Sequence, residues 1–446
     1  MIPQLRDLEH AFPHELVVIG VHSAKFPAER ESENLRAAVQ RHELDHSVVN
    51  DGDFAIWQSY AVRAWPTLMF VDPRGNVVGK HEGEFPFEPV RDLIQEMIAT
   101  FDAEGAVDRT SLPITPLPAV GGELRFPGKV LADEAGSRLL VADSGHNRIV
   151  VTGFDGKIDL VIGSGEPGFA DGDRDDARFD HPQGLALAED GKALYVADTE
   201  NHAIRAIELA TGRVTTVAGT GAQGHQRVGG PALETGISSP WDLTFLDNRL
   251  WIAMAGTHQL WTLDLGAGRL DVAAGTGVES IHDGPLLQAT FAQPSGITAS
   301  GGVLYTADSE TSSVRRVDPT EDRVRRLVGR GLFDFGDVDA RGDSVRLQHP
   351  LGVDAAIAEG ATVVYIADSY NDKIKRLDPA TREVETLFGG DARGAADGAW
   401  RTAEFWEPGG VSVAGRRLFI ADTNNHSVRV ADLDGGEVTT VTIRSA

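Results

Sequence analysis

Short runs of alternating apolar and polar residues recur through the C-terminal three-quarters of the chain. Six copies of one motif stand in register: LLVADSGHNRI at Leu139, LYVADTENHAI at Leu194, LWIAMAGTHQL at Leu250, LYTADSETSSV at Leu304, VYIADSYNDKI at Val364 and LFIADTNNHSV at Leu418. Their anchor positions, Asp143, Asp198, Met254, Asp308, Asp368 and Asp422, are separated by 55, 56, 54, 60 and 54 residues. A fixed period of this length, built from short strands, predicts a β-propeller or a related array.

Each copy contains four antiparallel strands by its alternation and turn residues. In the second copy, GLALAE leads through Asp190-Gly191 to ALYVAD, then through TENH to AIRAIEL and through ATGR to VTTVAG. Six such copies predict an all-β, six-bladed propeller over residues 123–446, with the first strand of each copy along the channel.

The connections that follow the fourth strands are long. Connections of about 20 residues in a compact domain are usually functional, and these leave the same face as the turns after the AD pairs. We therefore predict that a protein or peptide partner binds the face with the long connections and the channel mouth. Candidate residues at that rim are His181, Trp241, His349 and Trp406.

The turn after each AD pair carries a second signal. It reads Asn201-His202-Ala203 in one copy and Asn425-His426-Ser427 in another, and these residues resemble the NHL-repeat family. Short polar side chains at such turns usually hydrogen-bond the nearby backbone, which is a structural task. We assign that task to the turn residues Asp143, Asp198, Asp308, Asp368, Asp422, His202 and His426. The third copy departs furthest, because Met254-Ala255 replaces its Asp-Ser or Asp-Thr pair.

The first hundred residues follow a different pattern, of helices and strands in turn. Residues 1–12, 28–42, 54–62 and 88–100 have helical character, residues 16–22 and 47–51 form strands, and residues 66–83 form a hairpin around Asp72-Pro73-Arg74-Gly75. This order, with Trp65-Pro66-Thr67 before the hairpin, resembles the thioredoxin-like fold. The resemblance assigns residues 1–105 to an α/β thioredoxin-like domain and implies a peptide groove at Trp65, Pro66 and Thr67.

The segments IGVHSAKF, VND, WPTLMFVDPRGN and GEF, together with the propeller, resemble the NHL-repeat-containing protein 2 family, which joins these two folds. The thioredoxin-like domain is expected to be incomplete, because its first strand and CxxC pair would precede Met1. Two hypotheses follow: a shortened form of a redox-competent protein, which predicts a gap in the sheet, or a degenerate domain kept as an accessory to the propeller. The Pro- and Gly-rich residues 106–122 are the predicted linker.

The composition argues against several classes of partner and of chemistry. A formal charge of −26 argues against nucleic acid and anionic membranes as partners. The chain has no cysteine, which excludes disulfides, thiolate nucleophiles and thiolate metal sites in these residues. Its start lacks a basic segment followed by an apolar one, which predicts a cytoplasmic protein. The acidic run at residues 171–176 lacks the glycine and glutamate of an EF-hand loop, so no metal is assigned to it.

The favoured interpretation is a non-catalytic protein-interaction or scaffold protein without a cofactor. Two alternatives stay open. One is a thiol-disulfide oxidoreductase whose CxxC lies upstream of this chain. The other is a metal-dependent propeller hydrolase or lyase that uses histidine and aspartate residues at the rim.

Overall fold

The computed structural model describes residues 1–83, 85, 87–110, 112–120 and 122–445, and the chain divides into two compact units, Met1–Val120 and Gly121–Ala446. Glu84 of the GEF segment, and Ser111 and Gly121 of the predicted linker, lie outside the described residues. Within the described part of the chain, no helix is long and apolar enough to cross a membrane.

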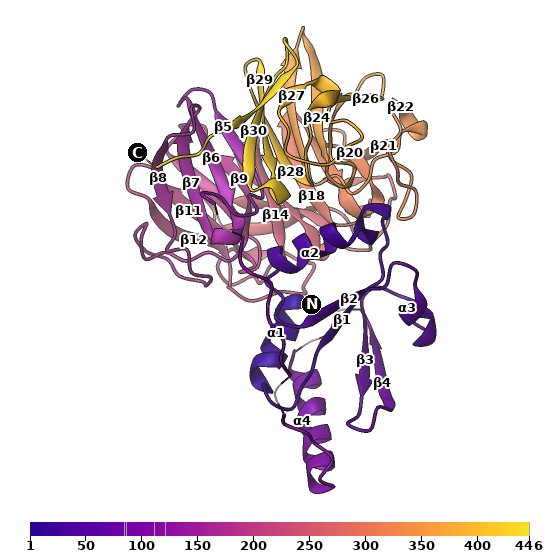
Figure 1. Ribbon diagram of the computed structural model, residues 1–446. Helices are drawn as coiled ribbons and strands as arrows, with labels where there is room; N and C mark the ends of the chain where they lie inside the picture. Colours follow the sequence, from indigo (N-terminus) through magenta and orange to yellow (C-terminus); the bar gives the residue numbers. More distant parts are fainter. Residues whose placement is uncertain (84, 86, 111, 121, 446) are drawn as a thin grey trace. The chain divides into compact units, whose positions relative to one another are not determined.

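The first unit has helices and strands in the predicted order (Figure 1). Its elements are α1 (Ile2–Ala11), β1 (Ile19–His22), the 3-10 helix η1 (Pro27–Arg30), α2 (Ser32–Arg41), β2 (Ser47–Asn50), α3 (Ala55–Ser59), β3 (Thr67–Val71), β4 (Val77–Glu82) and α4 (Phe87–Ala103). Leu8 of α1 is buried against Val90 and Ile94 of α4, and Leu5 and Phe12 pack on the same cluster. Helix α1 therefore uses one apolar face to join the core of this unit.

The sheet of the first unit is interrupted. Strand β1 pairs in parallel with β2, and β3 pairs antiparallel with β4, but no ladder joins the two pairs among the described residues. Strands β1 and β3 each have only one partner strand there, which matches the gap expected of a thioredoxin-like sheet without its first strand. Ile19 and Val21 of β1 are 61% and 43% exposed, so one apolar face of this strand is uncovered.

The second unit is a six-bladed propeller, as predicted (Figure 1). From the axis outward, the strands are β5 (Val130–Asp133), β6 (Arg138–Asp143), β7 (Arg148–Gly153) and β8 (Ile158–Ile162) in blade 1; β9 (Pro182–Leu187), β10 (Ala193–Asp198), β11 (Ala203–Glu208) and β12 (Arg213–Gly219) in blade 2; and β14 (Pro240–Leu246), β15 (Arg249–Met254), β16 (Gln259–Asp264) and β17 (Arg269–Ala274) in blade 3.

The other three blades repeat this order. Their strands are β18 (Pro294–Ser300), β19 (Val303–Asp308), β20 (Ser313–Asp318) and β21 (Arg323–Val328) in blade 4; β23 (Gly352–Ala358), β24 (Ala361–Asp368), β25 (Lys373–Asp378) and β26 (Glu383–Phe388) in blade 5; and β28 (Pro408–Ala414), β29 (Arg417–Asp422), β30 (Ser427–Asp432) and β31 (Glu437–Val441) in blade 6. Five of the turns after the second strands are 3-10 helices: η2 (Ser144–His146), η3 (Ala255–Thr257), η5 (Ser309–Thr311), η7 (Ser369–Asn371) and η9 (Thr423–Asn425).

The sequence predicted that the long connections lie on one face of the propeller, but in the structure they extend beyond that face. Each runs along the outermost strand of the blade that follows it. Three of them add a short fifth strand there: β13 (Gly230–Pro231) on β17, β22 (Ala340–Arg341) on β26 and β27 (Gly398–Ala399) on β31. In blades 2 and 4 single bridges do the same, from Gly172 to Val214 and from Gly284 to Val324. The connections also contain the 3-10 helices η4 (Leu286–Gln288), η6 (Gly342–Ser344) and η8 (Trp400–Thr402). The connections therefore cover the outer edges of the blades as well as one face.

Every blade is made from one continuous segment, so the ring closes without sharing a blade between the two ends of the propeller. Strand β5 of blade 1 lies beside β28 of blade 6. The C-terminal residues also reach the outer edge of blade 1, where the N–H of Ile158 donates to the carbonyl of Arg444 at 2.9 Å and the N–H of Arg444 donates to the carbonyl of Gly156 at 3.0 Å. Blade 1 is thus edged by the C-terminal tail, where the other blades are edged by a connection.

Candidate functional site

The aspartate of each AD pair is fully buried at the end of the second strand. In blade 6 the Asp422 carboxylate accepts hydrogen bonds from the N–H of Trp406 at 2.9 Å, from Asn425 Nδ2 at 2.9 Å and from Arg429 Nη1 at 2.8 Å. Burial raises the pKa of Asp422 to about 6 in spite of these donors. The carboxylate therefore ties the turn to the segment that leads into the first strand of the same blade.

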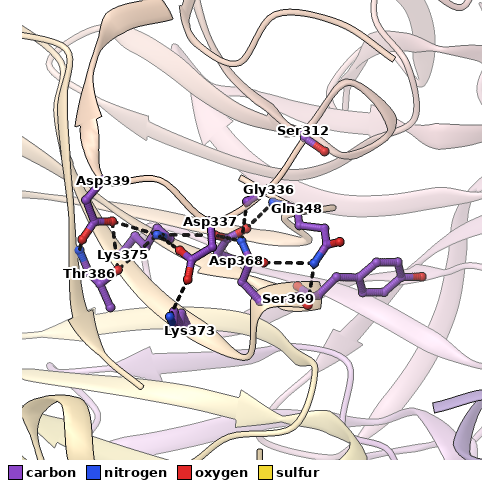
Figure 2. Close-up of polar contacts among 12 residues, drawn as sticks. Ser312, Gly336, Asp337, Asp339, Gln348, Asp368, Ser369, Lys373, Lys375 and Thr386 are labelled. Carbon is purple, nitrogen blue, oxygen red and sulfur yellow. Dashed lines mark hydrogen bonds and ion pairs between the residues drawn. The ribbon is translucent and has the colours of Figure 1, made fainter. Parts of the chain in front are cut away.

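A buried cation follows this aspartate by seven residues in four blades. The cations are Arg205, Arg315, Lys375 and Arg429. In blade 5, Figure 2 shows Lys375 Nζ between Asp337 at 2.6 Å and Asp339 at 2.8 Å, both from the preceding connection, with Asp368 Oδ2 at 3.8 Å. The cation thus fixes the connection to the blade that it borders. These cations were not predicted from the sequence.

In the third blade the motif differs at two positions together. Met254 replaces the aspartate, and seven residues later stands Trp261, so blade 3 has an apolar pair where four of the other blades have opposite charges. Both side chains are fully buried in the same core cluster. Trp261 Nε1 donates to Gln259 Oε1 at 3.2 Å, which satisfies its one polar atom. Because both charges are lost together, neither of these two positions holds an unpaired buried ion.

The middle residue of the NHL-like turn joins each blade to the next one. It accepts a hydrogen bond from the backbone N–H of a residue with positive φ that precedes the next first strand. The six acceptor and donor pairs are Asn147 with His181, His202 with Ser239, His258 with Gln293, Ser312 with His349, Asp372 with Glu407 and His426 with Phe126, at 2.8 to 3.2 Å. Burial lowers the pKa of His202 and of His426 to about 4, so both rings are neutral and can accept through Nδ1.

A second hydrogen bond crosses five of these six joints. The hydroxyl group after the AD pair donates to the carbonyl of the proline at the start of the next blade. The donors are Ser144, Thr199, Ser309, Ser369 and Thr423, and the acceptors are Pro182, Pro240, Pro350, Pro408 and Pro127 respectively. Blade 3 has Ala255 at this position and lacks the hydroxyl. The AD[ST] and NHL residues therefore hold the ring together, which accounts for their recurrence without a catalytic role.

Three of the four predicted rim residues, His181, His349 and Trp406, lie in the segments that lead into the first strands of blades 2, 5 and 6. The fourth, Trp241, is the second residue of β14 in blade 3. His181 Nδ1 is 2.7 Å from Asp180 Oδ1, and His349 stacks on Tyr370 with ring centroids 4.4 Å apart. Trp241 and Trp406 are partly exposed. Among the described residues, no group of three or more His, Asp or Glu side chains is placed to hold a metal ion.

The channel is blocked beside this rim by an ion pair. Two positions after the proline at the start of each blade, four blades have glycine. These residues are Gly184, Gly296, Gly352 and Gly410. A Cβ on Gly184 would lie 2.4 Å from Asp242 Cα, and one on Gly352 would lie 2.8 Å from Gly410 Cα. The two remaining blades place Lys129 and Asp242 at this level, with Nζ 3.6 Å from Oδ2. Lys129 also donates across the axis to the carbonyls of Ser295 and Leu351. The predicted channel mouth is therefore filled.

The predicted groove in the first unit has an aromatic wall. The Trp65–Pro66 peptide bond is cis, and Trp65 is 46% exposed. Its ring lies 4.4 Å from that of Trp57, and its Nε1 donates to the carbonyl of Ser23 at 2.7 Å. Thr67 Oγ1 donates to the carbonyl of Ala64, so this hydroxyl serves the local turn. Binding of a peptide at Trp65, Pro66 and Thr67 stays a prediction.

Large exposed apolar side chains of the propeller gather in the connections. Eight of the nine in the described part of this unit lie there: Phe169, Val228, Leu233, Val278, Leu287, Phe333, Val338 and Trp400. The ninth, Ile357, lies at the end of a first strand. These eight side chains are distributed over all five connections.

This repeat, with its buried Asp-cation pairs and its six similar joints, defines a six-bladed NHL-repeat β-propeller. The NHL repeat family matches residues 179–207 and 405–431. NHL repeat-containing protein 2 of Bos taurus is 41% identical over 478 residues, which cover 97% of this chain and 64% of the relative. Protein SUPPRESSOR OF QUENCHING 1, chloroplastic, of Arabidopsis thaliana is 41% identical over 458 residues, covering 98% of this chain and 43% of the relative.

The chain therefore belongs to the family of NHL repeat-containing protein 2, and it spans less than two-thirds of the length of these relatives. Among solved structures, an auxiliary nutrient binding protein from Bacteroides thetaiotaomicron matches with a TM-score of 0.53 at 14% identity, covering 72% of this chain and 70% of that one. This likeness concerns the fold alone.

Proposed function

We propose that this protein is a non-catalytic interaction or scaffold protein whose partner, a protein or an extended peptide, binds the surface made by the long connections of the propeller. The observation that supports this is the concentration of exposed apolar side chains in those connections. Val228 and Leu287, from different connections, are 67% and 61% exposed. Apolar side chains in loops held by a rigid scaffold are typical of recognition surfaces.

The anchoring of the connections supports the same proposal. Lys375 holds Asp337 and Asp339, and the buried arginines hold Asp171, Asp283 and Asp397 in the same way. A connection fixed at its middle loses less conformational entropy when a partner binds, which favours affinity. Shortening residues 220–238 or 330–347 would be a poor test, because the second deletion removes Asp337 and Asp339, two of the three acidic partners of Lys375.

Single substitutions test the proposal without that loss. The full chain, Val228→Asp, Leu287→Asp and the control Ile357→Asp would be immobilised and incubated with extract of the source cells, and the captured proteins would be quantified by mass spectrometry. Ile357 is 61% exposed but lies outside the connections, so it matches the others in exposure and chemistry. We expect capture to fall with the first two variants and to persist with the control. Capture that is the same for all four proteins would overturn the proposal.

A second candidate function, thiol-disulfide exchange by a longer form of the chain, is favoured by one observation. The sheet of the first unit is interrupted between β1 and β3, beside the cis Trp65–Pro66 bond. We infer that a strand followed by a cysteine pair would complete this sheet. Sequencing of the gene upstream of Met1 and an insulin-reduction assay of the longer product would test it. A longer product without a cysteine pair, or without activity, would refute this candidate and leave the first one untouched.

A further inference from the structure

A cavity of about 440 Å³ lies on the axis of the propeller, on the far side of the Lys129–Asp242 pair from the predicted rim. All six first strands line it. It begins at the level of this ion pair and extends along the strands to Asp133 and Glu134, where Glu134 is exposed. Its volume is in the range of sites that bind small molecules, about 300–1,000 Å³.

One carboxylate stands in the first layer of side chains beyond the ion pair. In this layer the six blades contribute Leu131, Ala186, Thr244, Thr298, Asp354 and Ser412. The Asp354 carboxylate accepts hydrogen bonds from Thr298 Oγ1 at 2.9 Å, from the N–H of Ala355 at 2.8 Å and from the N–H of Val413 at 2.8 Å. These donors fix its orientation, and the side chain remains partly accessible.

Among the residues that the structure describes, the charge of Asp354 has no counterpart. Within the described residues, no Lys, Arg or His side chain forms an ion pair with it, whereas Lys129 is matched by Asp242. Burial and the neighbouring Asp242 raise the pKa of Asp354 to about 6 in spite of its three donors. A buried carboxylate without a cation is costly, because desolvation is not offset by an ion pair. A cation that enters the cavity would supply the missing charge.

We propose that this axial cavity binds a small organic cation, a primary or secondary ammonium compound whose nitrogen meets Asp354. A carboxylate has about four lone-pair positions, and Asp354 already accepts three hydrogen bonds, so one N–H of an ammonium group can bind the position that is left. The lining also includes the apolar residues Leu187, Phe245 and Val413, which suit an aliphatic body. A metal ion fits less well, because no third His, Asp or Glu joins Asp242 and Asp354 among the described residues.

The chain length of the ligand can be held constant while its charge is changed. Binding of pentylammonium, pentanol and pentanoate to the full-length protein would be measured by isothermal titration calorimetry at pH 7.5. We expect pentylammonium to bind at least tenfold more tightly than pentanol, and pentanoate to bind more weakly than either. The affinity for pentylammonium should fall as the pH is lowered from 7.5 to 5, because Asp354 then takes up a proton. Equal affinities for pentylammonium and pentanol, or tighter binding of pentanoate, would overturn the proposal.

Two variants locate the site. Asp354→Asn should weaken pentylammonium binding at least tenfold. Asp391→Asn removes a carboxylate that is fully exposed in a connection, and this control should bind like the unchanged protein. Methyl NMR of the unchanged chain gives an answer that does not depend on the folding of a variant. Pentylammonium should shift the methyl signals of Leu187, Ile297 and Val413, which line the cavity. Shifts only at methyl groups outside the cavity, or equal binding by Asp354→Asn, would overturn the proposal.

Discussion

Replacement of Arg429 by methionine should destabilise the propeller strongly. Arg429 is fully buried and donates to Asp422 at 2.8 Å, to Asp397 at 2.8 Å and to the carbonyls of Glu404 and Ala396 at 2.9 and 3.0 Å. Loss of one partner from a buried ion pair costs about 3–5 kcal/mol. Two carbonyl groups also lose a donor, so we expect the upper end of that range, about 5 kcal/mol.

The uncompensated charge of Asp422 should account for much of this loss. The double variant Asp422→Asn, Arg429→Met removes that charge and keeps an oxygen for the N–H of Trp406. We therefore expect it to be about 2 kcal/mol more stable than Arg429→Met alone, since the remaining buried group is neutral. Blade 3 shows that the fold accepts a pair without charges, because Met254 and Trp261 occupy the two positions there.

Urea denaturation followed by tryptophan fluorescence at pH 8 and at pH 5 would measure both effects. Burial already raises the pKa of Asp422 to about 6, and removal of the arginine should raise this pKa further. The folded single variant therefore binds a proton that the unfolded chain releases, and its stability should rise as the pH falls from 8 to 5. Arg213→Met is the control, because Arg213 is 63% exposed and its ion pair is open to solvent.

Equal losses of unfolding free energy in Arg429→Met and in the double variant at both pH values would refute this prediction. That result would mean that the hydrogen bonds to the connection, and not the charge of Asp422, carry the stability. A loss in Arg213→Met as large as that in Arg429→Met would show that burial is not the cause.

Three further predictions concern the joints and the axis. Gly352→Ala should cost about 1–3 kcal/mol by urea denaturation, because its Cβ would meet backbone at 2.8 Å, whereas Gly284→Ala, with nothing within 4 Å, should change little. His202→Ala should cost about 1–3 kcal/mol of stability, because the N–H of Ser239 loses its acceptor. His202→Asn should retain most of the stability. Only the unchanged protein should lose the stability that the neutral His202 ring contributes as the pH falls from about 6.5 to 4. Relative to Asp354→Asn, the unchanged protein should lose up to about 3 kcal/mol as the pH rises from about 4 to 6, because the folded-state pKa is raised to about 6; a flat difference would refute this.

The strands of the propeller were predictable because each obeys a period of two within a repeat near 55 residues. The polar turn residues could be identified from the sequence, but their partners could not, because Asp198 and His202 accept hydrogen bonds from the N–H groups of Asp180 and Ser239, 18 and 37 positions away. The path of the connections was not predictable either. Short pairs such as Gly230–Pro231 on β17 contain two residues and leave no alternation to detect.

The polar groups on the axis were missed for another reason. Lys129 and Asp242 look like ordinary surface residues when each is considered alone. What distinguishes them in the sequence is that both stand where the other copies have glycine. Only the closed ring brings the side chains of Lys129 in blade 1 and Asp242 in blade 3 within 3.6 Å of each other. Asp354 has even less signal, because its equivalents in the other blades range from Leu131 to Ser412.

The closure of the ring by whole blades has a consequence for folding kinetics. Five of the six joints between blades span 34 to 37 positions in sequence, but the joint between His426 and Phe126 spans 300 positions. Local contacts form quickly, and the entropy of closing a loop grows only with the logarithm of its length. We expect the blades to form in any order and this seam to close last. A circular permutant opened at another connection would move the seam to a new joint and should fold at a similar rate.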